Sequence, residues 1–118
     1  MLLNILMGID SHKIVENNMR KGLLEFMILL AISKNESYSS DIIGSLKKAD
    51  LIVVEGTLYP LLSRLRSSGL LSYIWKESDS GPPRKYYTLT DDGHNTLERM
   101  KKTWSSLEYS IKTLIKKI

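Results

Sequence analysis

The stretch Glu55–Gly69, EGTLYPLLSRLRSSG, decides the fold, because it has the apolar spacing and the end signals of one short helix. Its apolar residues recur at helical spacing and form one face: Leu58, Leu61, Leu62 and Leu65. At the start, the Thr57 hydroxyl is suited to capping the first turn. We expect Pro60 within that turn, where a missing N–H has no cost. At the end, Gly69 fits the left-handed position that terminates a helix.

The opposite face of this helix is polar and basic. It presents Tyr59, Ser63, Arg64 and Arg66. Arginine contacts guanine edges or phosphates, and hydroxyl groups contact phosphates, so the helix is suited to lie in a DNA groove. If Arg64 reads a base, its replacement by alanine should lower the binding free energy by about 1–3 kcal/mol. Many amphipathic helices show such residues to solvent and bind nothing, so the flanking segments decide between the two readings.

Composition narrows the class of protein. The chain has 118 residues, of which 42% are hydrophobic and 25% charged, which is typical of one soluble globular domain. Its net charge of +4 agrees with a nucleic-acid partner without requiring one. The absence of cysteine excludes disulfides, thiolate metal sites and cysteine catalysis.

Membrane, metal and catalytic signals are missing from the sequence. No apolar run is long enough to span a bilayer, and the start MLLNILMGID lacks the basic region and cleavage site of a signal peptide. We therefore expect a cytoplasmic protein with no membrane partner. His12 and His94 lack metal-ligand spacing, and no catalytic arrangement of side chains is evident. An enzyme, a cofactor and a bound metal are not expected.

A long apolar helix is predicted in the first third of the chain, before the Glu55–Gly69 helix. Residues 19–34 are apolar nearly all round, since Glu25 is the only polar residue from Leu23 to Ile32. A domain this small rarely encloses such a helix, so a second subunit is expected to cover it; a central helix in a compact monomer is the alternative. Residues 1–18 carry a weaker helical pattern and form an N-terminal extension.

A second short helix, roughly Ser40–Lys48, is capped by Ser39 or Ser40 and should turn its apolar residues inward. Those residues are Ile42, Ile43 and Leu46. The brief connector Ala49–Val54 leads from it into the helix predicted at Glu55–Gly69. Two short helices joined in this way, the second with an exposed polar face, predict a helix-turn-helix.

A β-hairpin follows. Leu70–Glu77 and Arg84–Leu89 are rich in β-branched and aromatic residues, and Ser78–Pro83 has the composition of a turn. A hairpin directly after a helix-turn-helix predicts the wing of a winged helix. Arg84 and Lys85 lie near its tip, where they can meet phosphates or enter a minor groove; the alternative is a solvated edge that discourages aggregation.

The last helix is predicted to begin after Thr90, which caps it. It carries a heptad seam of Leu97, Met100, Trp104, Leu107, Ile111, Leu114 and Ile118. A helix of about 28 residues is about 42 Å long and projects beyond so small a domain, so its distal half needs a partner. A second copy is the simplest partner; a seam folded back on its own domain is the alternative.

These elements predict a mainly α fold with a small β-hairpin, namely a winged helix-turn-helix followed by a long dimerisation helix. The expected divisions are residues 1–18, an N-terminal extension; 19–89, the DNA-binding domain; and 90–118, the dimerisation helix. Rival functions remain open: a winged helix used for protein interaction, or an effector-independent, nucleoid-type DNA binder. The salt dependence of DNA binding separates the first of these from a regulator.

Three motifs resemble the PadR family of bacterial transcriptional regulators: Tyr38, the run Gly56–Pro60 and the run Arg84–Thr90. The resemblance covers about Met19 to Ile118 and is strongest to the short subfamily, which includes multidrug-sensing repressors. It implies a homodimer that represses transcription, with the last helix packed against the partner's first long helix. It also implies contact with a double-stranded operator through Ser39, Ser40, Thr57, Tyr59, Ser63, Arg64, Arg66, Arg84 and Lys85.

The resemblance also implies a ligand site. In the multidrug-sensing members, a tryptophan at the position of Trp104 lines a pore across the dimer axis and stacks on flat aromatic compounds. The neighbours expected around it are Phe26, Leu30, Met100 and Glu108. A ring and a carboxylate together suit a flat cation. The alternative is that Trp104 simply packs in the dimer core.

Overall fold

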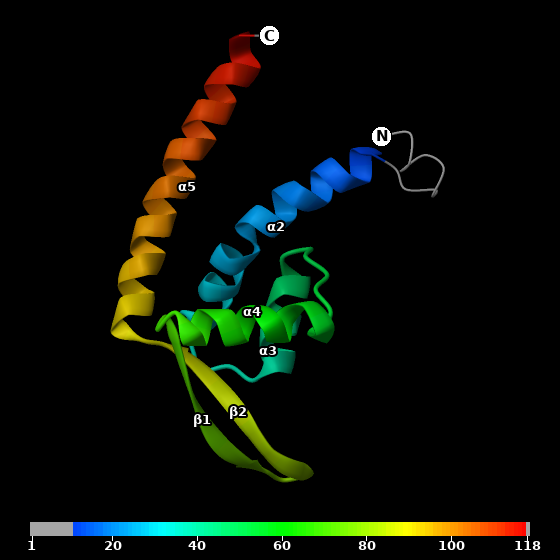
Figure 1. The fold of residues 1–118 in the computed structure, drawn as a ribbon, viewed down its shortest axis with the longest axis vertical. Coiled ribbons are helices and arrows are strands. Elements are labelled where there is room, and N and C mark those ends of the chain that lie inside the picture. Colours follow the sequence, from blue (N-terminus) through cyan, green and yellow to red (C-terminus); the bar gives the residue numbers. More distant parts are fainter. Residues whose placement is uncertain (1–10, 118) are drawn as a thin grey trace.

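The computed structural model describes residues 11–117 of the chain. The elements follow in the order α2 (Ser11–Ile32), α3 (Ser39–Lys48), α4 (Glu55–Ser67), β1 (Leu71–Ser78), β2 (Gly81–Leu89) and α5 (Asp91–Lys117). The helices α3 and α4 lie in the middle of the molecule, the hairpin projects to one side, and α2 and α5 diverge on the other (Figure 1). The predicted mainly α fold with a small antiparallel hairpin is confirmed.

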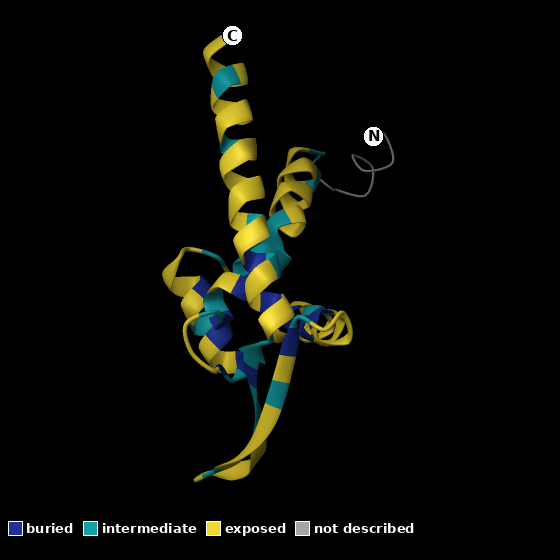
Figure 2. Ribbon diagram, turned by 90° about the vertical axis from the view of Figure 1, so that its left-hand side faces the viewer, coloured by how far each residue is buried: buried dark blue, intermediate teal, exposed yellow. Residues whose placement is uncertain are grey.

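The hydrophobic core lies where these elements meet, and it draws one or more residues from each of them. Its fully buried side chains include Ile28 and Leu29 of α2, Ile42 of α3, Leu58 and Leu62 of α4, and Leu97 of α5. The dark blue, buried positions in Figure 2 are confined to this meeting point, and the outer ends of α2, α5 and the hairpin are exposed. The inward apolar faces predicted for α3 and α4 are therefore confirmed.

The start of α4 differs from the prediction. The helix begins at Glu55, Val54 occupies the N-cap position, and the Thr57 and Leu58 amides both donate to the Val54 carbonyl, each at 3.0 Å. The prediction that Thr57 caps the helix is wrong, because the chain becomes helical two residues earlier. Pro60 is consequently the sixth residue of α4, beyond the first turn, and it cannot donate to the carbonyl one turn before it.

The helices α3 and α4 end in the same way, with a residue in the left-handed conformation after the last turn. Gly69 has a φ of +82°, as predicted, and the Leu70 amide reaches back to the Leu65 carbonyl at 3.0 Å. Asp50 takes the same left-handed position after α3, with a φ of +63°, and the Leu51 amide donates to the Leu46 carbonyl at 2.9 Å. Both helices therefore stop at fixed points, which sets the course of the connector between them.

The start of α3 also corrects a prediction. The helix begins at Ser39, directly after Tyr38, and the Tyr38 amide donates to the Asp41 carboxylate at 3.0 Å. Ser39 and Ser40 thus lie inside the first turn and neither caps it. The cap comes instead from an acid three residues on, whose charge is favourable at a helix N-terminus.

The wing is longer and its turn tighter than predicted. β1 pairs antiparallel with β2 so that Tyr73 faces Tyr87 and Trp75 faces Lys85. The turn is confined to residues 79–80, and Pro82 and Pro83 belong to β2, not to the turn. Prolines are tolerated there because each strand of a two-stranded sheet has an unpaired edge.

The unpaired edge of β2 is partly covered. The Ser37 and Tyr87 backbones exchange two hydrogen bonds, at 2.9 and 2.8 Å, and so form an isolated bridge beside the hairpin. This bridge fixes the α2–α3 turn against the base of the wing.

α2 runs unbroken from Ser11 to Ile32, across the predicted boundary between residues 18 and 19. Residues 1–10, the rest of the predicted N-terminal extension, lie outside the described residues, and the division of the chain at 18 and 89 remains a prediction. Among the described residues, no helix combines the length and the apolarity needed to cross a membrane.

Thr90 joins the wing to α5. Its hydroxyl accepts from the Gly93 amide at 2.9 Å, which confirms the predicted cap, and donates to the Gly69 carbonyl at 2.6 Å. Its own amide donates to the Leu70 carbonyl at 3.1 Å. A single residue thus ties the end of α4, the start of β1 and the start of α5 together. We call these contacts the Thr90 junction.

The seam of α5 is buried only at its base. Leu97 is 2% exposed, whereas Trp104 is 37% exposed and Leu114 62% exposed. Ile118, the last predicted seam residue, lies outside the described residues. Within one chain, the distal half of the seam does not fold back on its own domain, because α5 leaves the core and projects beside α2 (Figure 1).

Replacing Gly93 by alanine should destabilise the protein by about 2–4 kcal/mol. The new methyl group would clash with backbone atoms, which cannot move aside as a flexible side chain could. A Cβ at Gly93 would lie 2.1 Å from the Leu70 carbonyl oxygen. Urea unfolding measures the change. Gly44→Ala is the control: nothing lies within 4 Å of its Cβ, so it should stabilise α3 by about 0.5–1 kcal/mol. Equal stability of the two variants would contradict the prediction.

Candidate functional site

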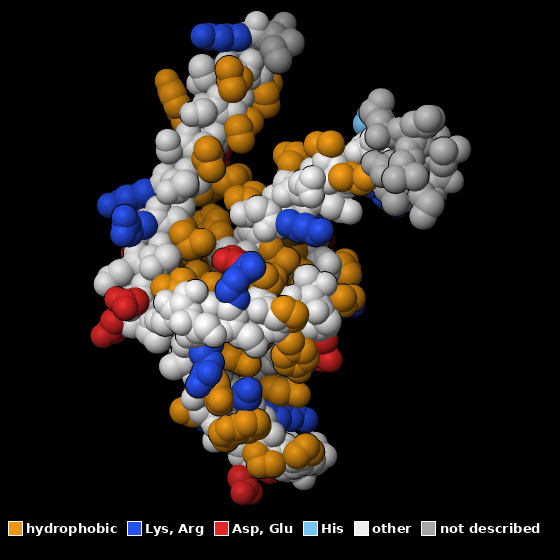
Figure 3. Space-filling model, viewed as in Figure 1, with side chains coloured by type: hydrophobic (Ala, Val, Ile, Leu, Met, Phe, Trp, Pro, Cys, Tyr) orange, Lys and Arg blue, Asp and Glu red, His pale blue; other side chains and the backbone are white. Residues whose placement is uncertain are grey.

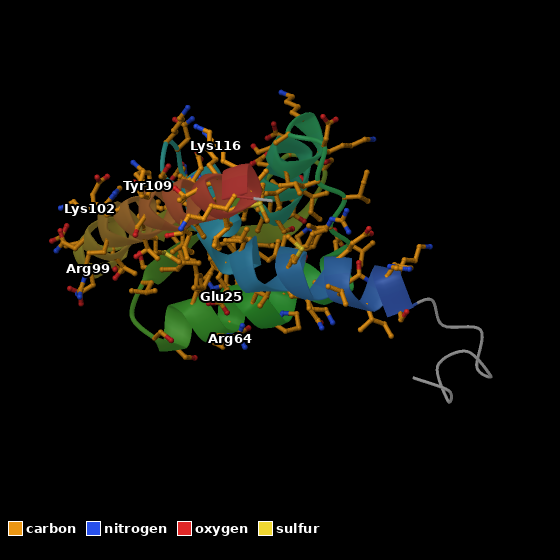
Figure 4. The ribbon with its side chains drawn as sticks, turned by 90° about the horizontal axis from the view of Figure 1, so that it is seen from above. Glu25, Arg64, Arg99, Lys102, Tyr109 and Lys116 are labelled. Carbon is orange, nitrogen blue, oxygen red and sulfur yellow. The ribbon has the colours of Figure 1, made fainter. Side chains whose placement is uncertain are left out.

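The polar residues of α4 lie on two separate flanks. Tyr59 and Ser63 line a hollow between α4 and the wing. Thr57 lines a groove on the other side, against α2 and the α3–α4 connector. Arg64 also faces α2, where it forms an ion pair with Glu25 (Figure 4). The sequence placed these residues on one face, and the structure brings only part of that face to the wing.

Ser39 positions Tyr59. Its side chain is 1% exposed, and its hydroxyl lies 3.1 Å from the Tyr59 hydroxyl in a hydrogen bond. Ser39 is therefore held beneath Tyr59, at the inner side of the hollow that both residues line. Ser40, one residue on, is exposed at the start of α3. Tyr59 itself is 44% exposed and remains accessible.

Cations of α4 and the wing are held over aromatic rings on one face of the hairpin. The Arg66 guanidinium lies 4.7 Å from the centre of the Tyr73 ring. The Lys85 ammonium lies 4.5 Å from the Tyr73 ring and 5.4 Å from the Trp75 ring. Such contacts hold a cation in place while leaving it free to bind an anion. This array links the C-terminal part of α4 to the wing.

A second array occupies the other face of the hairpin. Arg84 lies 4.7 Å from the Tyr38 ring, which packs on Tyr86 at 6.0 Å. Lys76 lies 5.2 Å from the Tyr86 ring and forms an ion pair with Glu36. Arg84 and Lys85, predicted together, are therefore divided between the two faces, as alternation along a strand requires.

The hollow between α4 and the wing has a volume of about 400 Å³. Tyr38, Tyr59, Trp75 and Tyr87 contribute rings to it, and Arg84 and Lys85 contribute positive charge. Figure 3 shows the corresponding mixture of hydrophobic and basic side chains between α4 and the hairpin. A surface that combines rings, hydroxyls and cations is suited to an anionic polymer such as DNA.

Tyr87 forms the base of this hollow and is 6% exposed. Burial is the main cause that raises the pKa of its phenol above the ordinary value of 10.0, and the nearby phenols of Tyr59 and Tyr73 add to the increase. The Arg66 cation opposes it. The neutral phenol is therefore favoured in the folded protein.

The residues predicted to bind an aromatic effector come from α2 and α5. Phe26 and Met100 pack against the core, while Leu30 and Trp104 are 36% and 37% exposed. Glu108 is bonded to Lys112 at 2.9 Å. Hydrophobic side chains border the space between the two helices (Figure 3). The exposed pair lies where α2 and α5 diverge, and ligand binding there remains a prediction.

Several residues of the site had no assignment from sequence. Glu25 and Glu36 form ion pairs with cations of α4 and the wing. Other cations of α4 and the wing lie over the aromatic rings of Tyr73, Trp75 and Tyr38. Tyr73 and Trp75 are two residues apart on a strand, so a shared face was detectable. The two acidic partners were not, since they lie 39 and 40 residues away from their cations. Within residues 11–117, no group of three or more His, Cys, Asp and Glu side chains is arranged to hold a metal.

Comparison with known proteins gives a consistent result. Residues 28–99 match the family model described as the transcriptional regulator PadR-like family. The chain is similar to a PadR-like transcription factor from Bacteroides fragilis, with 52% identity, a TM-score of 0.74 and coverage of 85% of this chain and 97% of that one. It is also similar to a PadR-like transcriptional regulator from Bacillus cereus, with 38% identity, a TM-score of 0.75 and coverage of 83% and 96%. A PadR family regulator from Eggerthella lenta shares 32% identity, with a TM-score of 0.77 and coverage of 89% and 90%.

Alkaline pH should destabilise the protein partly through Tyr87. Because its pKa is raised on folding, the unfolded chain loses this proton first, so stability is fully present below pH 10 and is lost as pH rises through the folded pKa. Urea midpoints of the wild type and Tyr87→Phe, compared at pH 8 and pH 10.5, should show a smaller alkaline loss in the variant. Tyr109→Phe, at an exposed residue, is the control and should lose as much stability at alkaline pH as the wild type. If Tyr109→Phe loses as little stability as Tyr87→Phe, Tyr87 is not the cause of the alkaline loss.

Proposed function

Because the chain belongs to the PadR-like family of transcriptional regulators, we propose that it is a homodimeric repressor that binds a pseudo-palindromic operator. Each copy presents α4 to a major groove and its wing to the neighbouring backbone or minor groove. The observation that carries the proposal is the pair of cation–ring arrays, which hold Arg66 against the wing and place Arg84 and Lys85 among the residues that line the hollow.

The geometry supports a division of tasks within this surface. Tyr59 and Ser63 on the wing-side flank of α4 are our candidates for contact with bases, together with Arg66. Arg84 and Lys85 are candidates for phosphate contacts, as is Ser40 at the exposed first turn of α3. Ser39 contributes by holding the Tyr59 hydroxyl in place.

Arg64 and Thr57 take a secondary place in the proposal. Both lie on the flank of α4 that faces α2, and Arg64 is already paired with Glu25. That ion pair has exposed fractions of 66% and 33% and contributes at most about 1 kcal/mol, so DNA can displace it. Arg64 would have to leave Glu25 before it could contact DNA. The wing-side residues Tyr59, Ser63 and Arg66 have no ion pair to break among residues 11–117.

The unpartnered seam supports dimerisation. Leu107, Ile111 and Leu114 are about half exposed or more on one side of α5. On α2, Val15 and Met19 are 61% and 67% exposed. Packing of α5 against α2 of a second copy would cover both sets. A dimer that binds one face of DNA would place its two α4 helices about 34–36 Å apart.

We also propose release by a small aromatic effector between the copies, near Trp104. A ligand bound there would alter the angle between the two α5 helices, and with it the spacing of the two reading helices. Its affinity must then differ between free and DNA-bound protein, because such coupling is reciprocal.

Replacing Lys85 by alanine should weaken operator binding and reduce the slope of log K against log salt by about 0.9, the change expected for one lost phosphate contact. A gel-shift titration at four salt concentrations measures both quantities. Lys102→Ala is the matched control, since Lys102 carries the same charge on the outer side of α5 (Figure 4) and should leave the slope unchanged. If both variants lose the same slope, the wing does not contact phosphate.

Replacing Leu107 by glutamate should convert the dimer to a monomer, because a charge would be buried without a partner in the seam. Sedimentation velocity at micromolar protein measures the state. Tyr109→Glu is the control: Tyr109 is 74% exposed on the outer side of the same helix (Figure 4), and its variant should remain dimeric. A dimeric Leu107→Glu protein would rule out the seam as the interface.

A further inference from the structure

The hollow between α4 and the wing has features of a small-molecule site as well as of a DNA surface. Its volume of about 400 Å³ falls within the range of ligand pockets, roughly 300–1,000 Å³. The hydrogen-bonded pair Ser39–Tyr59 and the buried Tyr87 form its inner side. Trp75, which is 61% exposed, offers an accessible ring at its outer side.

The charge of this hollow has one sign. Two cations, Arg84 and Lys85, lie among the described residues that line it, and no Asp or Glu does. Both cations are partly buried and already held over rings, so they lose little side-chain freedom when they bind an anion. A ligand with an anionic group and a flat ring would satisfy both components of the lining.

We propose that this hollow binds a small planar aromatic anion of the mononucleotide type. The ring of the ligand stacks against Trp75, and its phosphate is held by Lys85, which lies on the same face of the hairpin as Trp75. Arg84 and the hydroxyls of Tyr59 and Ser63 belong to the same lining. This site differs from the seam near Trp104 in the sign of its charge. Glu108 beside the seam suits a cation, whereas the hollow suits an anion.

The proposal has a regulatory consequence, which rests on the proposed function. Lys85, the cation that would hold the ligand, is one of those we assign to operator phosphates. Ligand and DNA therefore exclude one another directly, without a change in the dimer angle. Binding of the ligand itself does not depend on DNA and can be tested alone.

The chain has two tryptophans, so each can be observed by itself. In Trp104→Phe, Trp75 is the only tryptophan, and under selective excitation of tryptophan AMP should quench its fluorescence saturably. Adenosine and inorganic phosphate, which each supply one half of the chemistry, should require at least about tenfold higher concentrations, since each loses one group of contacts. In Trp75→Phe, the emission of Trp104 should not respond to AMP.

A pair of charge variants tests the location of the site. In the Trp104→Phe background, Lys85→Gln should weaken AMP binding by about tenfold or more, the loss expected for a hydrogen bond between charged groups. Lys76→Gln is the matched control, because Lys76 lies over Tyr86 on the other face of the hairpin and does not line the hollow. Equal loss in both variants would overturn the proposal, as would quenching confined to Trp104 or no saturable quenching of Trp75.

Competition separates this proposal from the proposed function. Operator DNA added first should abolish the AMP response of Trp75, and AMP should lower apparent operator affinity in the wild type. Selective DNA binding without AMP quenching would refute the ligand site and leave the repressor. Saturable AMP quenching in a protein that binds no DNA selectively would refute the repressor and leave the ligand site. Simultaneous binding of both would refute the exclusion.

Discussion

The arrangement of this molecule depends on one cluster of hydrogen bonds, the Thr90 junction. A single hydroxyl accepts from the first turn of α5 and donates to the carbonyl of Gly69, the residue that ends α4. The adjacent amide is bonded to Leu70, where β1 is about to begin. The close approach of α5 to the Leu70 carbonyl is possible only because residue 93 is a glycine and has no side chain. The orientations of α4, the wing and α5 are therefore set at one point.

The wing is oriented by a second set of contacts that are independent of this junction. Backbone hydrogen bonds between Ser37 and Tyr87 attach the hairpin to the turn after α2, and cations of α4 and the wing lie over rings on the two faces of the hairpin. A two-stranded hairpin alone is marginally stable in water, so these attachments are what give it a defined direction. The wing is thereby held by backbone hydrogen bonds at its base and by cation–ring contacts farther along its two faces.

The sequence was informative where a signal is local and periodic. The leucines of α4, the apolar residues of α3, the Thr90 cap and the glycine stop at Gly69 were all predicted correctly, because each depends on residues within a few positions of one another. The cap of α3 was mispredicted because several hydroxyl residues lie near its start and the Asp41 carboxylate provides the cap instead. The cap of α4 was mispredicted because the chain becomes helical two residues before Thr57. The partition of α4 into two flanks depends on Glu25 and on the position of the wing. Periodicity within one helix does not contain that information.

The length of α5 has a mechanical consequence. The helix has 27 residues and therefore extends about 40 Å from the Thr90 junction. For a rigid rod of that length, each degree of rotation at the base displaces the far end by about 0.7 Å. The helix is therefore a long lever arm whose base lies beside the end of α4. A displacement of about 3 Å at the exposed end therefore corresponds to a turn of only about 4° at the base of the helix. In the proposed dimer, small rotations of α5 would be enough to change how the two α4 helices match the helical repeat of DNA.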